Sequence, residues 1–319
     1  KCNIIDTPGH MDFIAEVERT FKMLDYHKKK NHLVIEINER IQGMTLLEFF
    51  HYLHLSKKTI HLLRQNKDYT LNNTYVDYQT ILKDKDILSI KAYEQGRDFI
   101  EEESSLDIIY EDDLLCIVNK PSNLIIHPDD KSKKDTLCNY VSYYYQQTHQ
   151  DLPIRYLHRL DRDTTGLVMF CKCALLQPYF DALIASKEIK KTYLAIIQGH
   201  LPKREMTIGL PISQDRHSKN KMCISKTGKE AITHFKEVKT KGNYTLVKCQ
   251  IETGRKHQIR VHLNHLHHPI VGDFLYGKAS SKIKRMALHA YCLEFIHPLS
   301  NQPMMIECPL PFDMEKILK

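Results

Sequence analysis

Alternation of apolar and polar residues predicts the strands of this chain, and its longest apolar runs predict strands buried on both faces. Residues 247–252 alternate strictly between the two classes, which indicates a half-buried strand. Residues 167–171 and 190–199 are largely apolar at successive positions, as expected of strands inside a sheet. Residues 108–118 form two apolar runs around an acidic turn, which predicts a pair of neighbouring strands.

Capping residues and 3.6-residue spacing predict the helices. Thr45 and Glu48 have the spacing of a capping box, and Ser56 is the predicted N-cap of a second helix. Ile259, Leu263 and Leu266 have the spacing i, i+4 and i+7, which predicts an amphipathic helix after the strand at 247–252.

The N-terminal third combines its two helices with a strand at His32–Ile37, a turn at Asn72-Asn73 and a closing strand at 87–90. The second helix is basic, because no acidic residue occurs from Phe49 to Lys67. This arrangement resembles the S4 RNA-binding domain. The resemblance implies that cations of the second helix contact RNA phosphates, although a one-signed helix face is often only solvated. The candidate RNA-binding residues of this helix are Lys57, Lys58 and Arg64.

Composition places the chain among globular proteins with room for two domains. It has 319 residues, of which 42% are hydrophobic and 27% charged. No apolar run approaches the roughly 20 residues of a membrane-spanning helix, and the first residues lack the pattern of a secretory signal. The nine cysteines are scattered without a CxxC pair, so we expect reduced thiols and a cytoplasmic location. The net charge of +7 is compatible with a polyanionic partner but does not establish one.

The first 25 residues differ from the rest. Asp6-Thr7-Pro8-Gly9-His10 resembles the DTPGH switch region of translational GTPases, with the nearest likeness to tetracycline-resistance ribosomal protection proteins. A GTPase also needs a GxxxxGK[ST] loop to hold the nucleotide phosphates, and the sequence has none. We therefore interpret residues 1–25 as an inert fragment of an unrelated gene with at most a helix from Met11 to Leu24. Deleting residues 1–25 should leave activity unchanged.

The stretch with the strongest chemical character surrounds Asp161. This carboxylate lies among four basic side chains and precedes a turn at Thr164-Thr165-Gly166 that leads into the strand at 167–171. A carboxylate ringed by cations should stay ionised, which suits a nucleophile better than a general acid. The residues alone also fit a salt-bridge cluster on the surface. The surrounding basic residues are Arg155, His158, Arg159 and Arg162.

The order His158-Arg159-Leu160-Asp161-x-x-Thr164-Thr165-Gly166-Leu167 resembles the signature of RluA-type pseudouridine synthases, which convert uridine to pseudouridine in ribosomal and transfer RNA. Further blocks of this family follow in the right order, and the resemblance covers about residues 32–319. One departure is Asn123, which stands where the family has Gly in its NKPxGLxxHP block and leaves the local turn geometry open. The matching blocks lie at 119–128, 190–199, 252–263, 268–277 and 288–298.

The resemblance implies three catalytic residues. Asp161 would be the catalytic carboxylate, although attack at C1′, attack at C6 and removal of the 2′ proton all remain open. Tyr193 would lie under the uracil with its hydroxyl available for the C5 proton; the alternative is a core tyrosine with a satisfied hydroxyl. Arg260, in the block that resembles TGRTHQIRVH, would pair with Asp161 and fix its orientation.

The resemblance also implies RNA contacts around the site. The target uridine must be flipped out of a folded RNA, and Arg159 would fill the space that it leaves. His158 would help to position Arg159 or would be a hydrogen-bonded loop histidine. Arg255 would contact a phosphate or pair locally with Glu252.

The implied fold is α+β: an S4-like domain at 26–94, a linker at 95–105, and a catalytic domain at 106–319 with a cleft across a mostly antiparallel sheet. Isomerisation needs no cofactor, and we interpret the histidines at 257–268 as belonging to the family pattern rather than to a metal site. The expected partner is large-subunit ribosomal RNA, with transfer RNA as the alternative, bound by a monomer without membrane contact. A non-catalytic ribosome-assembly factor would not need Asp161, Tyr193 and Arg260 together.

Overall fold

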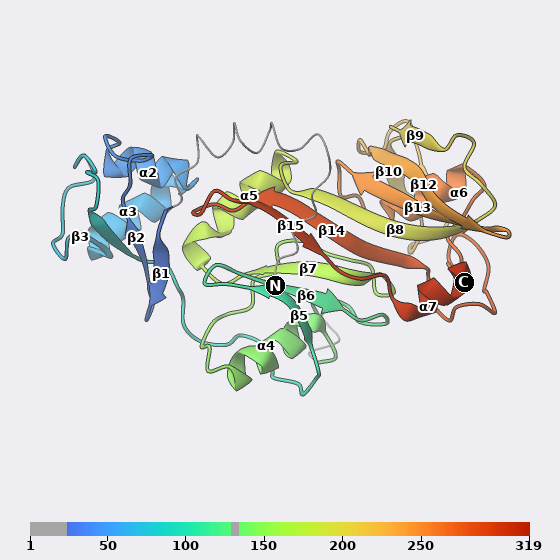
Figure 1. Ribbon diagram of the computed structural model, residues 1–319, viewed down its shortest axis with the longest axis horizontal. Coiled ribbons are helices and arrows are strands. Elements are labelled where there is room, and N and C mark those ends of the chain that lie inside the picture. The colour runs from blue at the N-terminus through green and yellow to red at the C-terminus, as the bar shows by residue number, and fades with distance from the viewer. Residues whose placement is uncertain (1–23, 129–133) are drawn as a thin grey trace. The chain divides into compact units, whose positions relative to one another are not determined.

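The computed structural model describes residues 24–128 and 134–319 and divides the chain into two compact units (Figure 1). Of the described residues, one unit comprises 24–93 together with Ile296–Pro303, and the other comprises 94–128, 134–295 and Met304–Lys319. The segment Ile296–Pro303 therefore groups with the first unit, whereas the sequence placed it in the catalytic domain. The fragment expected at 1–25, with its possible helix, lies outside the described residues up to position 23.

The first unit is an antiparallel sheet with two helices. In sheet order its strands are β1 (Tyr26–Lys29), β2 (His32–Glu36), β4 (Ile87–Lys91) and β3 (Tyr69–Leu71), and its helices are α2 (Leu46–Tyr52) and α3 (Lys57–Asn66). Both predicted caps are present: Thr45 and Glu48 form a reciprocal capping box, and the Ser56 side chain accepts from the backbone of Thr59. Local sequence alone therefore fixes where both helices begin.

Helix α3 buries one face and exposes its cations. Ile60 and Leu63 are buried, whereas Lys57, Lys58 and Arg64 are exposed. The guanidinium of Arg64 also lies 4.7 Å from the centre of the Tyr78 ring. The three candidate RNA-binding residues are thus presented to solvent on one helix.

The second unit is built on one large sheet, in which β8 lies between β14 and β13 (Figure 1). Within the described residues, the pairings along this sheet are antiparallel except that β7 and β14 are parallel. This agrees with the mostly antiparallel sheet expected from sequence. In sheet order the strands are β5 (Asp107–Glu111), β6 (Leu115–Lys120), β7 (Thr165–Cys171), β14 (Leu288–Ile296), β8 (Lys190–Gln198), β13 (Tyr244–Ile251), β12 (Thr233–Lys241) and β9 (Glu205–Ile208), with β15 (Pro303–Glu307) beside β14.

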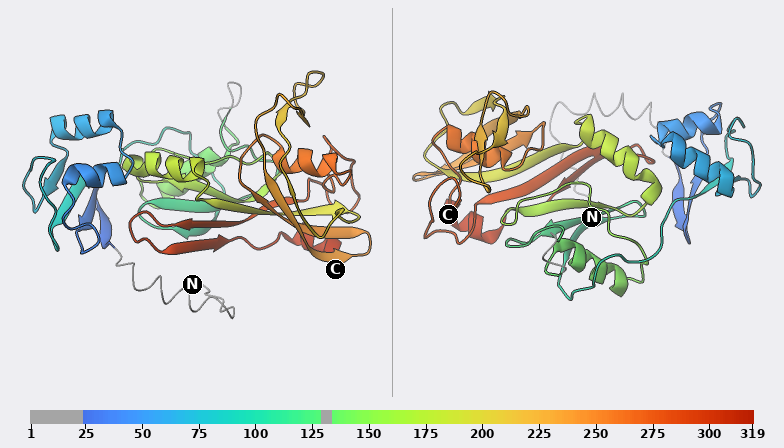
Figure 2. Two further views of the ribbon diagram at one scale, coloured as in Figure 1. Left: turned by 90° about the horizontal axis from the view of Figure 1, so that it is seen from above. Right: turned by 180° about the vertical axis from the view of Figure 1, so that it is seen from behind.

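Helices cover this sheet, and α5 and α6 lie on the same side of it (Figure 2). The helical elements are α4 (Leu137–Gln147), η1 (Ala174–Leu176), α5 (Gln177–Ala185), α6 (Gln258–His265), α7 (Phe312–Glu315) and η2 (Lys316–Leu318), and a separate hairpin joins β10 (Ile212–Gln214) to β11 (Met222–Ile224). The segment 95–105, expected as a linker, is hydrogen-bonded to this unit: side chains of Asn139 and Ser142 on α4 donate to the carbonyls of Ile100 and Phe99.

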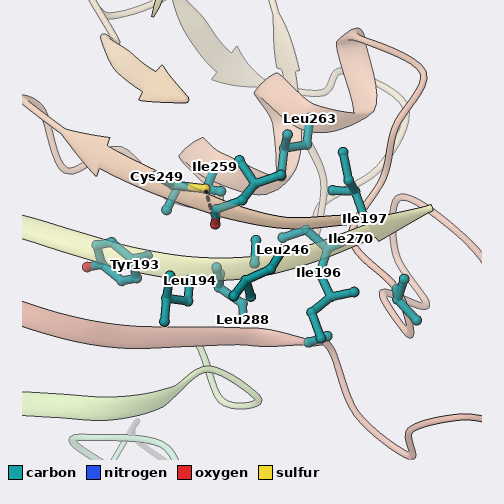
Figure 3. Close-up of a cluster of buried hydrophobic side chains, with 14 of the residues drawn as sticks. Tyr193, Leu194, Ile196, Ile197, Leu246, Cys249, Ile259, Leu263, Ile270 and Leu288 are labelled. Carbon is teal, nitrogen blue, oxygen red and sulfur yellow. Dashed lines mark hydrogen bonds between the residues drawn. The ribbon is translucent and has the colours of Figure 1, made fainter. Parts of the chain in front are cut away.

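The core of the second unit surrounds β8, where apolar residues of β13, α6 and β14 pack on Leu194, Ile196 and Ile197 (Figure 3). Tyr193 belongs to the same cluster and lies to the left of Leu194 along β8 in this view. Burial on both faces explains why this strand is apolar at successive positions. The cluster anchors the strand that carries Tyr193 and the helix that carries Arg260.

Candidate active site

Asp161 lies in the loop that leads into β7, and the loop is held at several points. The backbone of Leu157 donates to Met169 on β7, and the backbone of Thr164 donates to the carbonyl of Asp161 at 3.1 Å. Just after the loop, Gly166 in β7 has φ +106°, and a Cβ there would lie 2.2 Å from the carbonyl oxygen of Ala290 on β14. Only glycine permits this approach of the two strands. The turn expected at Thr164-Thr165-Gly166 is formed earlier, at residues 162–163, because Thr165 and Gly166 already pair within the sheet as part of β7. The close approach of β7 to β14 at Gly166 therefore fixes the end of the loop that carries Asp161.

Lys120, at the end of β6, also holds the loop that carries Asp161. Its buried ammonium donates to the carbonyls of Pro121, Leu124 and Arg162, each at 2.8 Å. Burial lowers the pKa of Lys120 to about 7, and the nearby charges of Asp163 and Asp161 oppose this effect. Asn123, which replaces the family's glycine, adopts φ +57°. The left-handed turn is thus formed with Asn, which enters this conformation more readily than most residues.

Arg260 on α6 pairs with Asp161, as predicted. Its Nη1 donates to Asp161 Oδ2 at 2.8 Å. The other side of the guanidinium is held by Asp273, with Nε 2.7 Å and Nη2 2.9 Å from the two carboxylate oxygens. The Asp273 side chain is 1% exposed, and the two carboxylates raise the pKa of Arg260 despite its burial. A planar guanidinium held on two sides orients the catalytic candidate more rigidly than a single ion pair.

The pair opens into a cavity of about 500 Å³. Asp161 and Tyr193 both line it, together with residues from the end of α5 and the start of α6. Tyr193 is 7% exposed, and burial, followed by the charge of Asp161, raises its pKa. The phenol is therefore protonated at neutral pH. Lys191, two positions earlier on the same face of β8, also lines the cavity, and burial lowers its pKa.

The other predicted site residues near the cavity, Arg159, His158 and Arg255, differ in solvent exposure and in contacts. Arg159 is exposed at the cavity. His158 accepts a hydrogen bond from the backbone of Met169 at 3.2 Å, and burial lowers its pKa to about 3. These contacts favour the loop-histidine alternative. Arg255 lines the cavity, and its Nε donates to the carbonyl of Glu230.

The alternative pairing of Arg255 with Glu252 is not formed. Glu252 instead contacts Lys187 at 3.1 Å and His234 at 2.8 Å. Sequence reasoning missed this cluster, since its members come from separate strands and loops. Arg255 consequently keeps its terminal guanidinium nitrogens available to a phosphate.

The histidines of the α6 region are directed to different partners. His262 contacts Thr233 and the carbonyl of Leu210, and His268 contacts the carbonyl of Gln198. Within residues 24–128 and 134–319, no group of three or more histidine, cysteine or acidic side chains could hold a metal ion. In the same ranges no helix is long and apolar enough to cross a membrane.

Comparison with known proteins places this geometry in a family. The profile of the family described as RNA pseudouridylate synthase matches residues 114–265, and that of the RluD ribosomal pseudouridine synthase N-terminal domain matches residues 33–88. The chain is 36% identical over 297 residues to a Bacillus subtilis protein named "Uncharacterized RNA pseudouridine synthase YhcT", covering 92% of this chain and 98% of that protein. This chain belongs to the RluA/RluD-type RNA pseudouridine synthases.

The chain is also similar to other pseudouridine synthases. Ribosomal large subunit pseudouridine synthase D of Nitrosomonas europaea is 37% identical over 223 residues, which is 67% of this chain and 64% of that protein. The solved structure of human RNA Pseudouridylate Synthase Domain Containing 1 matches with a TM-score of 0.56 and 26% identity, covering 67% of this chain and 87% of that one. The protein is therefore a pseudouridine synthase, an isomerase that acts on RNA.

Proposed function

We propose that this pseudouridine synthase acts on large-subunit ribosomal RNA with Asp161 as its catalytic carboxylate. The observation that carries the proposal is the position of Asp161 in the 500 Å³ cavity, beside Tyr193 and fixed by Arg260. A nucleoside flipped out of RNA can enter a cavity of this size. The isomerisation needs neither redox chemistry nor an energy source, so the proposal includes no cofactor.

Each residue has a separate role in the proposal. Asp161 acts on the flipped nucleoside, and Arg260 orients the carboxylate. Tyr193 supports the detached uracil while it turns. Since its phenol is protonated at neutral pH, Tyr193 can take up the C5 proton only if its own proton leaves. Arg159 occupies the space left in the RNA, and Arg255 binds a neighbouring phosphate.

The choice of RNA rests on the relatives and on the first unit. Proteins named ribosomal large subunit pseudouridine synthase D are among the relatives, and the match to residues 33–88 has the same type of name. We propose that the exposed cations of α3, Lys57, Lys58 and Arg64, contact RNA phosphates as in an S4-like domain. Transfer RNA is the alternative substrate. The proposed site uses residues of one chain and is compatible with a cytoplasmic monomer.

Pseudouridine mapping of ribosomal and transfer RNA, in cells with and without the gene, tests the substrate. We expect positions in large-subunit ribosomal RNA to lose pseudouridine when the gene is absent and to regain it on complementation. Loss confined to transfer RNA would select the alternative substrate. No loss in either RNA would contradict the proposal.

Purified variants test the catalytic residue. Asp161→Asn should abolish turnover and leave RNA binding largely intact, because the amide keeps the shape of the carboxylate but not its charge. Asp163→Asn is the matched control, two positions further along the same loop, and should retain turnover. Residual turnover in Asp161→Asn would assign the chemistry to another group.

A further inference from the structure

His257 occupies the position before α6 and faces the catalytic candidate. Its Nε2 lies 3.7 Å from Asp161 Oδ2, and its Nδ1 lies 2.9 Å from the hydroxyl of Tyr276. The His257 side chain is 9% exposed, and the Tyr276 ring meets it edge to face, with ring centres 5.7 Å apart. Both nitrogens of this imidazole therefore have defined neighbours.

The contacts of Tyr276 determine which nitrogen carries the proton. The backbone N–H of Met222 donates to the Tyr276 hydroxyl oxygen at 2.8 Å. If Nδ1 of His257 also donated to that oxygen, the hydroxyl proton would have no acceptor among the described residues. If Nδ1 instead accepts the hydroxyl proton, the Tyr276 hydroxyl and His257 Nδ1 are both satisfied.

The other side of the ring supports the same assignment. With the proton on Nε2, an N–H group faces the Asp161 carboxylate; with the proton on Nδ1, a lone pair would face it. Burial lowers the pKa of His257, and Asp161 and Asp273 oppose this effect while Arg260 and Lys256 add to it. The ring is thus neutral at neutral pH and has one proton to place.

Both partners of Asp161 meet the same oxygen. Arg260 Nη1 and His257 Nε2 approach Oδ2, and within the described part of the chain no hydrogen bond reaches Oδ1. Oδ1 is consequently the oxygen left for the substrate. The 3.7 Å contact of His257 is too long for a hydrogen bond in the free protein, and contacts of this kind often shorten once substrate fills the site.

We propose that His257 is a positioning residue, which directs its Nε2–H at Asp161 Oδ2 and, with Arg260, leaves Oδ1 free to react, while Tyr276 sets the tautomer of the imidazole. The proposal rests on the proposed function of Asp161. It gives two residues of this family pattern, His257 and Tyr276, a specific part in arranging the carboxylate.

Nitrogen-15 NMR of the histidine rings tests the tautomer without any measurement of activity. The signals that disappear in His257→Gln identify this ring. We expect the wild-type protein to show the proton on Nε2, and Tyr276→Phe to show a mixture of tautomers or a shift toward Nδ1–H. An Nδ1–H ring in the wild type, or an unchanged ring in Tyr276→Phe, would overturn the proposal.

Single-turnover rates test the positioning role. His257→Leu removes the N–H donor and should slow the reaction by about 100-fold, the scale expected for a misplaced reacting group, with RNA affinity unchanged. His257→Gln keeps an N–H at a similar reach and should recover most of the rate. Both variants place a non-glycine residue at the same left-handed position, φ +57°, so backbone strain is matched between them.

The outcomes separate this proposal from the proposed function. A wild-type rate in His257→Leu, or a loss of RNA affinity in place of rate, would overturn the positioning role while Asp161→Asn remained inactive. Turnover in Asp161→Asn would instead remove the proposed function, and the NMR result would stand by itself. If His257→Leu fails to fold, the single-turnover rate of Tyr276→Phe, which should also fall, replaces it.

Discussion

Arg260 Nη1 lies 2.8 Å from Asp161 Oδ2, although 99 residues separate the two in sequence. The contact joins the loop before β7 to the start of α6, and the cavity opens beside it. The same guanidinium is bound on its other edge by the buried carboxylate of Asp273. Orientation of Asp161 by Arg260 therefore depends on Asp273 as well.

Replacing Arg260 by Lys should separate charge from geometry. The ammonium keeps the positive charge but cannot contact Asp161 and Asp273 along two edges. We expect the single-turnover rate to fall about 100-fold, with little change in RNA affinity. Arg204→Lys, an exposed arginine outside the cavity, is the matched control. An unchanged rate in Arg260→Lys would show that charge alone suffices.

Asp273→Asn should destabilise the protein and also slow the reaction that it catalyses. The substitution removes the charge that compensates buried Arg260 and weakens the acceptor of the Leu275 and Tyr276 backbone N–H groups. Removing one partner of a buried ion pair costs about 3–5 kcal/mol, which urea unfolding measures. A loss well under 1 kcal/mol would mean that water or Asp161 replaces Asp273.

Gly166→Ala should separate β7 from β14. The added methyl would lie 2.2 Å from the Ala290 carbonyl oxygen, which is backbone and cannot rotate away. A residue with a side chain is also strained at φ +106°. We therefore expect the unfolding free energy to fall by over about 4 kcal/mol, which is at the upper end for point substitutions. Gly209→Ala, with open space around its Cβ, is the control for urea unfolding and should stay near wild type.

Lys120→Met should leave the carbonyls of Pro121, Leu124 and Arg162 without their ammonium donor. Leu124 is buried, and an unsatisfied buried acceptor costs about 1–3 kcal/mol before relaxation. We therefore expect a clear loss of unfolding free energy and a slower reaction, because the carbonyl of Arg162 is no longer held. Lys190→Met, an exposed lysine on β8, should change stability little. Equal stabilities of the two variants would contradict the anchoring role.

Acid should destabilise the protein partly through His289. Its Nδ1 contacts Thr165 and its Nε2 the carbonyl of Cys308, and burial lowers its pKa to about 4. The unfolded chain therefore binds this proton at a higher pH than the folded one, so the stability present above about pH 6.5 is lost as pH falls toward 4.

The expected loss from His289 is about 2 kcal/mol between roughly pH 7.5 and pH 5. Urea unfolding at the two pH values measures it. His289→Gln does not titrate, so its stability should fall less over this interval, whereas His61→Gln, an exposed control, should follow the wild type. The same pH dependence in wild type and His289→Gln would contradict the assignment.

Local signals predicted the elements that depend on local interactions. Thr45 and Ser56 cap their helices through hydrogen bonds to residues three positions later, and both caps are present where the sequence predicted them. Strand β8 was predictable because burial on both faces requires apolar residues at successive positions. The pairing of Asp161 with Arg260 came from the family resemblance, since no local pattern connects residues so far apart.

The rest of the site depends on tertiary contacts that leave little trace in sequence. Asp273 belonged to a block with no assigned chemistry, and only the fold brings it to Arg260. Lys120 gave no sign that it binds three carbonyls. His158 was a candidate RNA contact in the sequence, yet its Nε2 accepts a hydrogen bond from the backbone of Met169. Individual side-chain contacts, which periodicity does not encode, decide each of these cases.

The order of strands sets a condition on synthesis of this protein. β7 and β8 follow one another in sequence, but β14 separates them in the sheet, and Leu288 of β14 lines the cavity. A nascent chain that has produced Asp161, Tyr193 and Arg260 still lacks the strand that joins their supports. We therefore expect the cavity to be complete only after this late strand has been translated, and chains that end before Leu288 to lack activity.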